Sequence, residues 1–420
     1  MHALEGLARE LFEEISAFPV VDCHEHLPSE PERVAEPMDA IQLFKHYCPA
    51  DLAAAGMPVR ERDEVFDASK PLEPRWAAFK PYLDAIRFGS YAYPAFAYAR
   101  EVLGFETIDD ATVGPISERL QADNRAGLYD RVLRDLCGID TVLECAGTMV
   151  PENPRYFAHL FTTWSHKLRA PLIARLEEET GIAVHSLGKC VDALQARVAR
   201  EKDKGCIAMK VGAAYSRSLD FADVTPAQAQ RVFADLRRGV DTVLSREDDW
   251  CLEDYLLRRE IEACIDLGLP VAIHTGYHAS NWNDIRNARA TELWHLLKSY
   301  PQARFDLFHG SFPYVSDMTV LGKYFPNVAL NMCWMHILSP TVSRRALDEW
   351  LDTVPVTKIF AFGGDYRVVE LVYGHLQLAR ENVAAVLAGR VGAGRMTRAQ
   401  AVEVARLLFY ENPRRWYGLA

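Results

Sequence analysis

Two histidines stand two residues apart in the stretch FPVVDCHEH, which covers residues 18 to 26. Pro19, Val20 and Val21 lead a short apolar run that is typical of a buried strand, and His24 and His26 follow at its end. Because alternate side chains of a strand share a face, both imidazoles should project the same way. Two neutral imidazoles held side by side bind one divalent transition metal. The competing interpretation is two histidines that only bond to backbone groups. Further ligand residues at the ends of the other strands would favour the metal site over it.

Further ionisable residues stand within or just after the later apolar runs, and they are Lys210, His274, His309 and Asp365. His24, His26, His274 and Asp365 form a set of three nitrogens and one oxygen that suits Zn²⁺ or a similar ion, with room for a water molecule. His309 is then predicted to act as a general base or electrophile, and Asp365 to take a proton from the water. Taken singly, His274 or His309 is better explained as a hydrogen-bonded core histidine, and only the residues together favour a metal site.

Lys210 lies in the apolar run CIAMKVG, where burying an unpaired cation costs free energy, so another group must balance its charge. Three hypotheses remain open. The amine is carboxylated and bridges two metals, with His274 and His309 holding the second ion. Alternatively it stays cationic and binds a substrate carboxylate or polarises a carbonyl, or it belongs to a structural ion pair.

Eight short apolar runs alternate with helical patterns and would position these residues. Most of them lie about 25–35 residues apart, which is the length of one strand–helix unit. This alternation predicts a parallel sheet closed into a (β/α)8 TIM barrel, whose active site lies at the carboxyl ends of the strands. An open doubly wound sheet is the second possibility, but no glycine-rich fingerprint follows the first run. The expected strands are 19–26, 141–145, 172–176, 207–211, 271–274, 305–309, 328–332 and 359–362.

A long segment of helical patterning, residues 27–138, separates the first strand from the second. We expect one barrel domain over residues 1–420, with this segment as a helical insertion that forms a lid or a substrate-facing layer. A peripheral helical decoration is the alternative.

Composition limits the class of protein. The hydrophobic content of 49% and charged content of 25% are those of a globular protein with a sizeable core. The net charge of −11 argues against nucleic acid as a partner. The nine cysteines are scattered, without a Cys-x-x-Cys pair, and suit a reducing compartment. No apolar run is long enough to cross a membrane, and the first residues predict an amphipathic helix. We therefore expect a cytoplasmic protein, which could form a homo-oligomer.

The series VDCHEH, MK, IHTG, FHGSFPY and FGGDYR, closing with FYENPRRWYGL, resembles the amidohydrolase superfamily. It looks most like the branch of TIM-barrel metal-dependent hydrolases that also includes decarboxylases, lactonases and uronate-isomerase-like proteins. The resemblance implies metal ligands at His24, His26, His274 and Asp365, and a catalytic residue or second-site ligand at His309. One departure is Gly364, where many relatives have Ser or Thr before the Asp.

Three polar residues lie just beyond the ligand-bearing strands and suit recognition of an acidic substrate: Tyr215, Arg217 and Arg367. The expected activity is hydrolysis of an amide, lactone or ester of a small, carboxylated molecule. The predicted catalytic residues are Asp365, His309 and Lys210. We expect one Zn²⁺ or similar ion, or two ions if Lys210 is carboxylated. A decarboxylase or uronate isomerase on the same scaffold is the alternative, and a non-catalytic metal-binding barrel is a third possibility.

Overall fold

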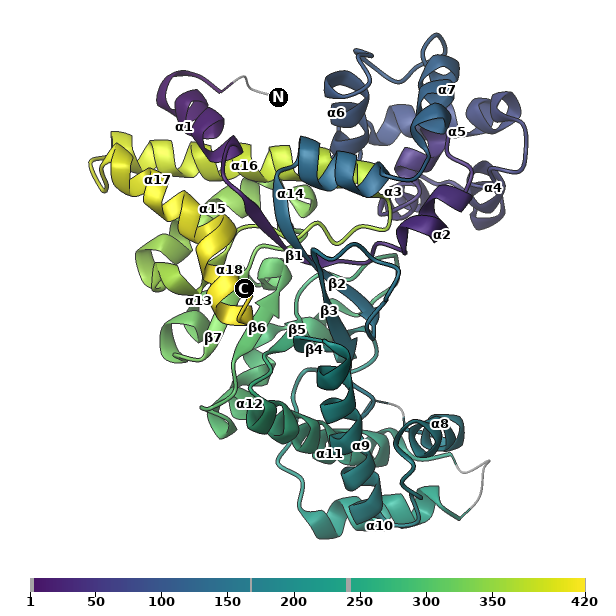
Figure 1. Cartoon of the computed structure of the whole chain (residues 1–420), viewed down its shortest axis with the longest axis vertical. Helices are drawn as coiled ribbons and strands as arrows, with labels where there is room; N and C mark the ends of the chain where they lie inside the picture. The colour runs from purple at the N-terminus through teal and green to yellow at the C-terminus, as the bar shows by residue number, and fades with distance from the viewer. Residues whose placement is uncertain (1–3, 167, 239–242, 420) are drawn as a thin grey trace.

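Eight parallel strands form one sheet in which each strand pairs with the next along the chain, from β1 to β8. The computed structural model describes residues 4–166, 168–238 and 243–419. This order confirms the predicted (β/α)8 barrel (Figure 1). The strands are β1 Val20–Glu25, β2 Ile139–Gly147, β3 Phe157–Thr162, β4 Ala208–Val211, β5 Val271–His274, β6 Phe305–Phe308, β7 Val328–Asn331 and β8 Ile359–Phe360.

The barrel is closed by backbone hydrogen bonds between β1 and the segment that follows β8. The Cys23 amide donates to the Phe362 carbonyl (3.1 Å), the Asp365 amide to the His24 carbonyl (2.8 Å), and the His26 amide to the Tyr366 carbonyl (3.0 Å). Because β8 itself is only two residues long, these bonds do the pairing that a longer strand would do. They also bring Asp365 beside both histidines of β1.

The barrel interior is filled by small and apolar side chains from alternate positions of the strands, as the pleat of a strand requires. Tyr417, from the last helix α18 (Asn412–Tyr417), packs into the same cluster. The interior cluster contains Val21, Cys23, Leu143, Leu160, Ala208, Ala272, Phe308, Ala329 and Phe360 among others.

Helices surround the barrel, and their apolar faces form the main core with the outer faces of the strands. A separate core joins α8, α9, α10 and part of α11 in the lower part of Figure 1. The helices outside the insertion are α1 Gly6–Ser16, α8 Ala170–Thr180, α9 Leu187–Lys204, α10 Pro226–Leu236, α11 Arg246–Leu267, α12 Trp294–Ser299, α13 Val315–Tyr324, α14 Met335–Leu338, α15 Pro340–Thr353, α16 Val369–Gly392, α17 Arg398–Arg406 and α18.

One predicted strand was wrong. Residues 172–176 belong to helix α8, where Ile173 and Leu176 are buried three residues apart, which is helical spacing. The third strand is instead β3, in which the polar His159 interrupts the apolar run. No helix separates β2 from β3. The prediction assumed a helix between every two strands, and it therefore placed the third strand too late in the chain. The last strand is also shorter than expected, since β8 ends at Phe360.

The segment between β1 and β2 is helical, and Figure 1 shows its helices gathered on one side of the barrel. Its longer helices are α2 Glu30–Ala35, α3 Cys48–Ala54, α4 Val59–Val65, α5 Leu72–Ile86, α6 Tyr93–Glu101 and α7 Val113–Asp123. Helix α6 packs closely on α16: a methyl group on Gly374 would lie 2.5 Å from Cα of Pro94. Such a close approach of two backbones is possible only because Gly374 has no side chain.

We predict that Gly374→Ala destabilises the protein by about 1–3 kcal/mol, because the added methyl group overpacks the α6–α16 contact. Gly389→Ala in the same helix is the matched control. A methyl group there meets no atom within 4 Å in the described part of the chain, so alanine should stabilise the helix by roughly 0.5–1 kcal/mol. Urea unfolding measures both. Equal stability of the two variants would show that α6 does not pack on α16 as described.

Candidate metal centre

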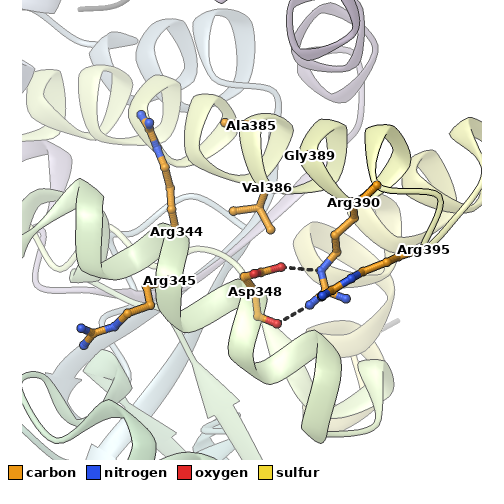
Figure 2. A pocket seen from close by; sticks show the side chains of 9 residues that line it. Arg344, Arg345, Asp348, Ala385, Val386, Gly389, Arg390 and Arg395 are labelled. Carbon is orange, nitrogen blue, oxygen red and sulfur yellow. Dashed lines mark hydrogen bonds and ion pairs between the residues drawn. The ribbon is translucent and has the colours of Figure 1, made fainter.

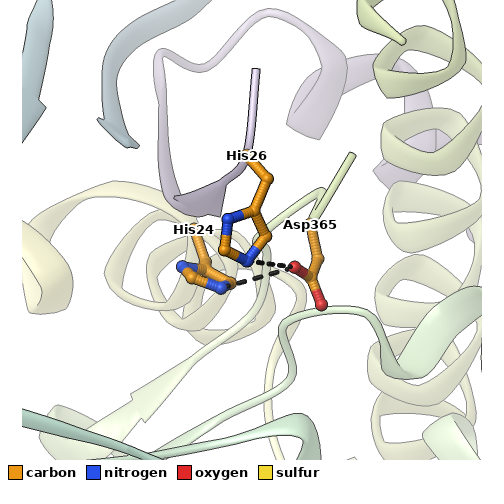
Figure 3. Close-up of side chains that lie close together, drawn as sticks. All are labelled: His24, His26 and Asp365. Atoms are coloured by element: carbon orange, nitrogen blue, oxygen red, sulfur yellow. Dashed lines mark ion pairs between the residues drawn. The ribbon is translucent and has the colours of Figure 1, made fainter. Parts of the chain in front are cut away.

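His24 of β1, His26 directly after β1 and the aspartate that follows β8 converge at the carboxyl end of the barrel. His24 Nε2 lies 3.3 Å from Asp365 Oδ1, and His26 Nε2 lies 3.4 Å from the same oxygen (Figure 3). One ligand atom from each residue lies within 4.8 Å of the other two. The spacing of His24 and His26 on one strand places both rings on the same side, as their order in the sequence predicts.

The hydrogen bonds of these histidines leave nitrogen lone pairs free for a metal. His26 Nδ1 donates to the Cys145 carbonyl (3.1 Å), so in the neutral ring the lone pair is on Nε2, which faces Asp365. Burial, with Lys210 nearby, lowers the pKa of His24 far below its ordinary value, and burial lowers the pKa of His26 to about 4. Both imidazoles are therefore neutral at pH 7, the state in which histidine binds metals.

Asp365 is held in a left-handed backbone conformation, with φ of 61°. The hydroxyl of Tyr47 donates to its carbonyl, and its own amide donates to His24. Burial raises the pKa of Asp365 to about 7, and the charge of Lys210 opposes the rise. No lysine or arginine of the described residues lies within 4.0 Å of this carboxylate. A buried carboxylate among neutral imidazoles lacks a cation, so the residues fit a divalent metal ion.

Two buried acids of β1 fix the loop that carries Asp365. Asp22 accepts hydrogen bonds from the amides of Gly364 (3.0 Å) and His24 (3.3 Å), and Glu25 accepts one from the amide of Tyr366 (2.6 Å). A methyl group on Gly364 would lie 1.8 Å from Glu25 Oε1. The Glu25 carboxylate thus fills the space that a serine or threonine would need, which accounts for glycine before the aspartate in this chain. The sequence analysis missed Glu25, although an acid inside a buried run was a signal.

His309 and His274 lie at the same rim but contact the Asp365 carboxylate less closely than His24 and His26 do. His309 is fully buried, with Nδ1 3.9 Å from Asp365 Oδ2 and 3.2 Å from the Cys333 carbonyl. With Cys333 and Asp365 it forms a second group of ligand atoms within 4.8 Å of one another. The His274 ring lies 4.3 Å from the His309 ring, while its Nε2 donates to the Tyr277 carbonyl. His274 belongs to neither group found among the described residues, and its role as a ligand stays a prediction.

Lys210, on β4, is buried beside these groups. Its Nζ lies 3.8 Å from the centre of the Phe308 ring and has no hydrogen-bond partner among the described residues. Burial lowers its pKa.

Of the three predicted substrate-binding residues, two lie at the rim. Tyr215 is 45% exposed, and its ring is tilted against that of His274 with ring centres 4.8 Å apart. Arg367 is exposed and lines a cavity beside His26. Arg217 is different: it is 1% exposed and paired with Glu253 (3.2 Å) and Asp254 (2.6 Å) of α11. The charge of Arg217 is therefore balanced by these two acids inside the protein and does not face the cavity.

The cavity beside the metal centre has a volume of about 420 Å³. Its polar lining comes from the insertion, from β2 and from the segments that follow β1 and β8, and it combines both signs of charge: His26, Glu36, Lys45, His46, Glu144 and Arg367. No pattern in the sequence pointed to His46, which is half-buried and whose Nδ1 has no partner in the described part of the chain. Burial lowers the pKa of His46 to about 3, so this ring is a neutral acceptor in the cavity.

A separate cavity of about 580 Å³ lies between α15 and α16, and none of the residues that line it belongs to a strand. Figure 2 shows its Arg390 bonded to Asp348 of α15. It takes no part in the metal centre.

The fold and the rim residues together define a (β/α)8 barrel with a candidate metal centre at the carboxyl ends of its strands. The chain belongs to the amidohydrolase family: the sequence model of that family, described as "Amidohydrolase", matches residues 166–419. This confirms the resemblance drawn from the motifs. In the described residues no helix is long and apolar enough to span a membrane.

Several known proteins are similar to this chain. Protein fluG of Emericella nidulans is 25% identical over 52% of the chain and 26% of fluG, and a uronate isomerase of Xanthomonas oryzae is 27% identical over 47% of the chain and 45% of that protein. The chain thus spans less than half the length of these two curated relatives. A uronate isomerase of Nostoc punctiforme is 22% identical over 98% of the chain and 95% of its own length.

Two solved structures share the fold over nearly the whole chain. Glucuronate isomerase from Caulobacter crescentus has a TM-score of 0.80 at 20% identity, covering 98% of this chain and 94% of that one. Uronate isomerase from Thermotoga maritima has a TM-score of 0.81 at 15% identity, covering 99% and 100%.

We predict that the protein, purified without chelators, holds about one equivalent of a divalent metal. Asp365→Asn and His24→Asn should lose most of it, because each removes one of the three converging ligands. His278→Asn is the control, since this buried imidazole bonds the Ala214 carbonyl instead. Elemental analysis by mass spectrometry measures the content. Full retention of metal by Asp365→Asn would contradict the assignment of the centre.

Proposed function

We propose that this protein is a metal-dependent aldose–ketose isomerase that acts on a sugar acid. The proposal is supported by the relatives, several of which are named uronate or glucuronate isomerases and match nearly the whole chain in sequence or structure. The single observation that carries it is the cavity beside the metal centre, where the exposed Arg367 has no ion pair within the described residues. It was the second expectation from the sequence, and the relatives favour it over hydrolysis.

The cavity offers the two ends of a uronate different partners. Arg367 and Lys45 supply positive charge for the carboxylate at one end, and a guanidinium binds a carboxylate in a bidentate manner. Lys45 is partly engaged by Glu36 at 3.5 Å, so Arg367 is the principal anchor. His26 lines the same cavity and also faces Asp365, so it joins the cavity to the metal centre.

Isomerisation moves one proton from C2 to C1 of the sugar and another from the C2 hydroxyl to the C1 oxygen, so it needs a base and a positive site for the oxygens. His24, His26 and Asp365 would hold the metal, which when bound polarises the carbonyl as a Lewis acid. We assign to Asp365 the transfer of the proton between the two carbons, because its Oδ1 faces His24 and His26 while its other oxygen, Oδ2, lies 3.9 Å from His309 Nδ1. Lys210 adds fixed positive charge beside the site.

Hydrolysis of an amide, lactone or ester is the second candidate, and the amidohydrolase family assignment favours it. The same ligands would then activate a water, and Asp365 would accept its proton. Product mass separates the two, since an isomerase gives a product of unchanged mass whereas a hydrolase adds one water.

The direct test is incubation of the metal-loaded protein with glucuronate and galacturonate, followed by proton NMR and mass spectrometry. We expect a ketose of unchanged mass and no reaction with glucose, which lacks the carboxylate that Arg367 would bind. Asp365→Asn should abolish turnover. Loss of CO₂, or turnover of lactones but of no uronate, would reject the isomerase.

Arg367→Met should raise KM for the uronate by about tenfold or more, which corresponds to about 1.4 kcal/mol of lost binding, with a smaller effect on kcat. Arg344→Met is the matched control, because Arg344 is also exposed and without an ion pair among the described residues but lines the cavity between α15 and α16. An unchanged KM in Arg367→Met would show that the carboxylate binds elsewhere.

A further inference from the structure

The segments that follow β3 and β4 bring a histidine and a serine together with an acid of helix α11. His166 follows β3, and Ser216 follows β4 directly after Tyr215. The Ser216 hydroxyl oxygen lies 2.8 Å from His166 Nε2. On the other side of the ring, His166 Nδ1 lies 3.1 Å from Oε1 of Glu253. None of these three residues belongs to the groups of candidate metal ligands found among the described residues.

The groups at its two ring nitrogens select the tautomer of His166. A carboxylate beside Nδ1 favours the proton on that nitrogen, so the lone pair of the neutral ring lies on Nε2. The Ser216 hydroxyl therefore donates to Nε2, and its contact with the Ala213 carbonyl, at 3.2 Å, is the longer one. A hydroxyl that donates to an imidazole can pass its proton to the ring as its oxygen attacks a carbonyl carbon.

Glu253 is held in place by Arg217, the residue next to the serine. Arg217 is buried and contacts the second carboxylate oxygen of Glu253, Oε2, at 3.2 Å. The segment that carries the serine thus also carries the cation that orients the acid. With Oε2 fixed in this way, Oε1 faces the His166 ring. The Glu253 carboxylate is then placed to stabilise the imidazolium ion that forms when His166 takes a proton.

Exposure decreases from the serine to the acid. Ser216 is exposed, His166 is half-buried and Glu253 is buried. A substrate can therefore reach the serine, while the acid is shielded from solvent, where its attraction to an imidazolium ion is stronger than it would be in water. A serine–histidine–acid set is recognised by this geometry and these roles, and it recurs on unrelated folds.

We propose that Ser216, His166 and Glu253 form a second, metal-independent site that takes up the acyl group of a small ester. The Ser216 oxygen bonds to the carbonyl carbon while its proton passes to His166 Nε2; the bond to the alcohol then breaks, and the alcohol leaves with that proton. A water that gives its proton to the same ring releases the acid and restores the serine. Ser216 and His166 are the catalytic residues, and Glu253 and Arg217 are positioning residues.

The test labels the metal-loaded protein with a fluorophosphonate, which bonds to an activated serine and expels fluoride. We expect one label per chain, located on Ser216 by mass spectrometry of peptides, and p-nitrophenyl acetate should leave an acetyl group on the same serine. Ser216→Ala should take up no label. His166→Asn should react slower by about a hundredfold or more, since a general base contributes about 10²–10⁴ in rate.

Ser218→Ala is the matched control for the labelling, because the Ser218 hydroxyl accepts a hydrogen bond from the Asp220 amide instead. It should label as the wild-type protein does, and so should wild-type protein from which a chelator has removed the metal. A label on another residue, a label that requires the metal, or a rate that His166→Asn leaves unchanged overturns the proposal.

NMR of protein labelled with ¹⁵N-histidine reads the arrangement directly. The His166 signals are assigned from their loss in His166→Asn, and we expect the neutral ring to carry its proton on Nδ1. Glu253→Gln should weaken this preference and slow the labelling about tenfold or more. Glu262→Gln is the matched control, on the same helix but paired with Arg259. A wild-type ring protonated on Nε2 overturns the proposal.

Turnover of uronates separates this site from the metal centre. The proposal does not rest on the isomerase activity, and Ser216→Ala should isomerise any uronate at the wild-type rate while it takes up no label. Loss of both labelling and isomerisation in Ser216→Ala would place the serine in the metal centre and overturn the proposal of a separate site.

Discussion

The hydrogen bond from the Asp365 amide to the His24 carbonyl is the constraint on which the site depends. It belongs to the set of three that closes the barrel, and it joins the two segments that carry the converging ligands. The buried carboxylates of Asp22 and Glu25 hold the same loop from below. Because closure of the barrel and assembly of the ligands use the same bonds, the metal centre cannot form unless the first and last strands have met.

Backbone strain gathers where the chemistry is expected. His309, Trp334, Asp365 and Tyr47 all have positive φ, a conformation that residues other than glycine adopt at a cost of about 1–3 kcal/mol each. Tyr47 donates to the Asp365 carbonyl, and its ring stacks on Trp334 with centres 4.6 Å apart. The surrounding contacts thus hold the carboxylate in an orientation that its own backbone would not prefer.

Residues of the insertion line the cavity beside the metal centre. Lys45 and His46 line the cavity beside His26, and Tyr47 reaches the metal-centre loop. The contact of α6 with Gly374 of α16 anchors the helices of the insertion to the barrel. The barrel rim carries the converging His24, His26 and Asp365, and loops of the insertion line much of the cavity. Such a division lets related barrels act on different substrates.

The sequence by itself determined the barrel and most of its rim, because parallel strands that alternate with helices end at one edge and because His-x-His places two rings on one face. It misplaced the third strand, since residues 172–176 satisfy helical spacing as well as they satisfy an apolar run. Only the tertiary structure decided which charges are free. Arg217 and Arg367 look equivalent along the chain, yet the first is buried between two acids of α11 and the second is exposed at the cavity. Which residues meet across the barrel is set by how the whole sheet curls, and no local pattern in the sequence records this.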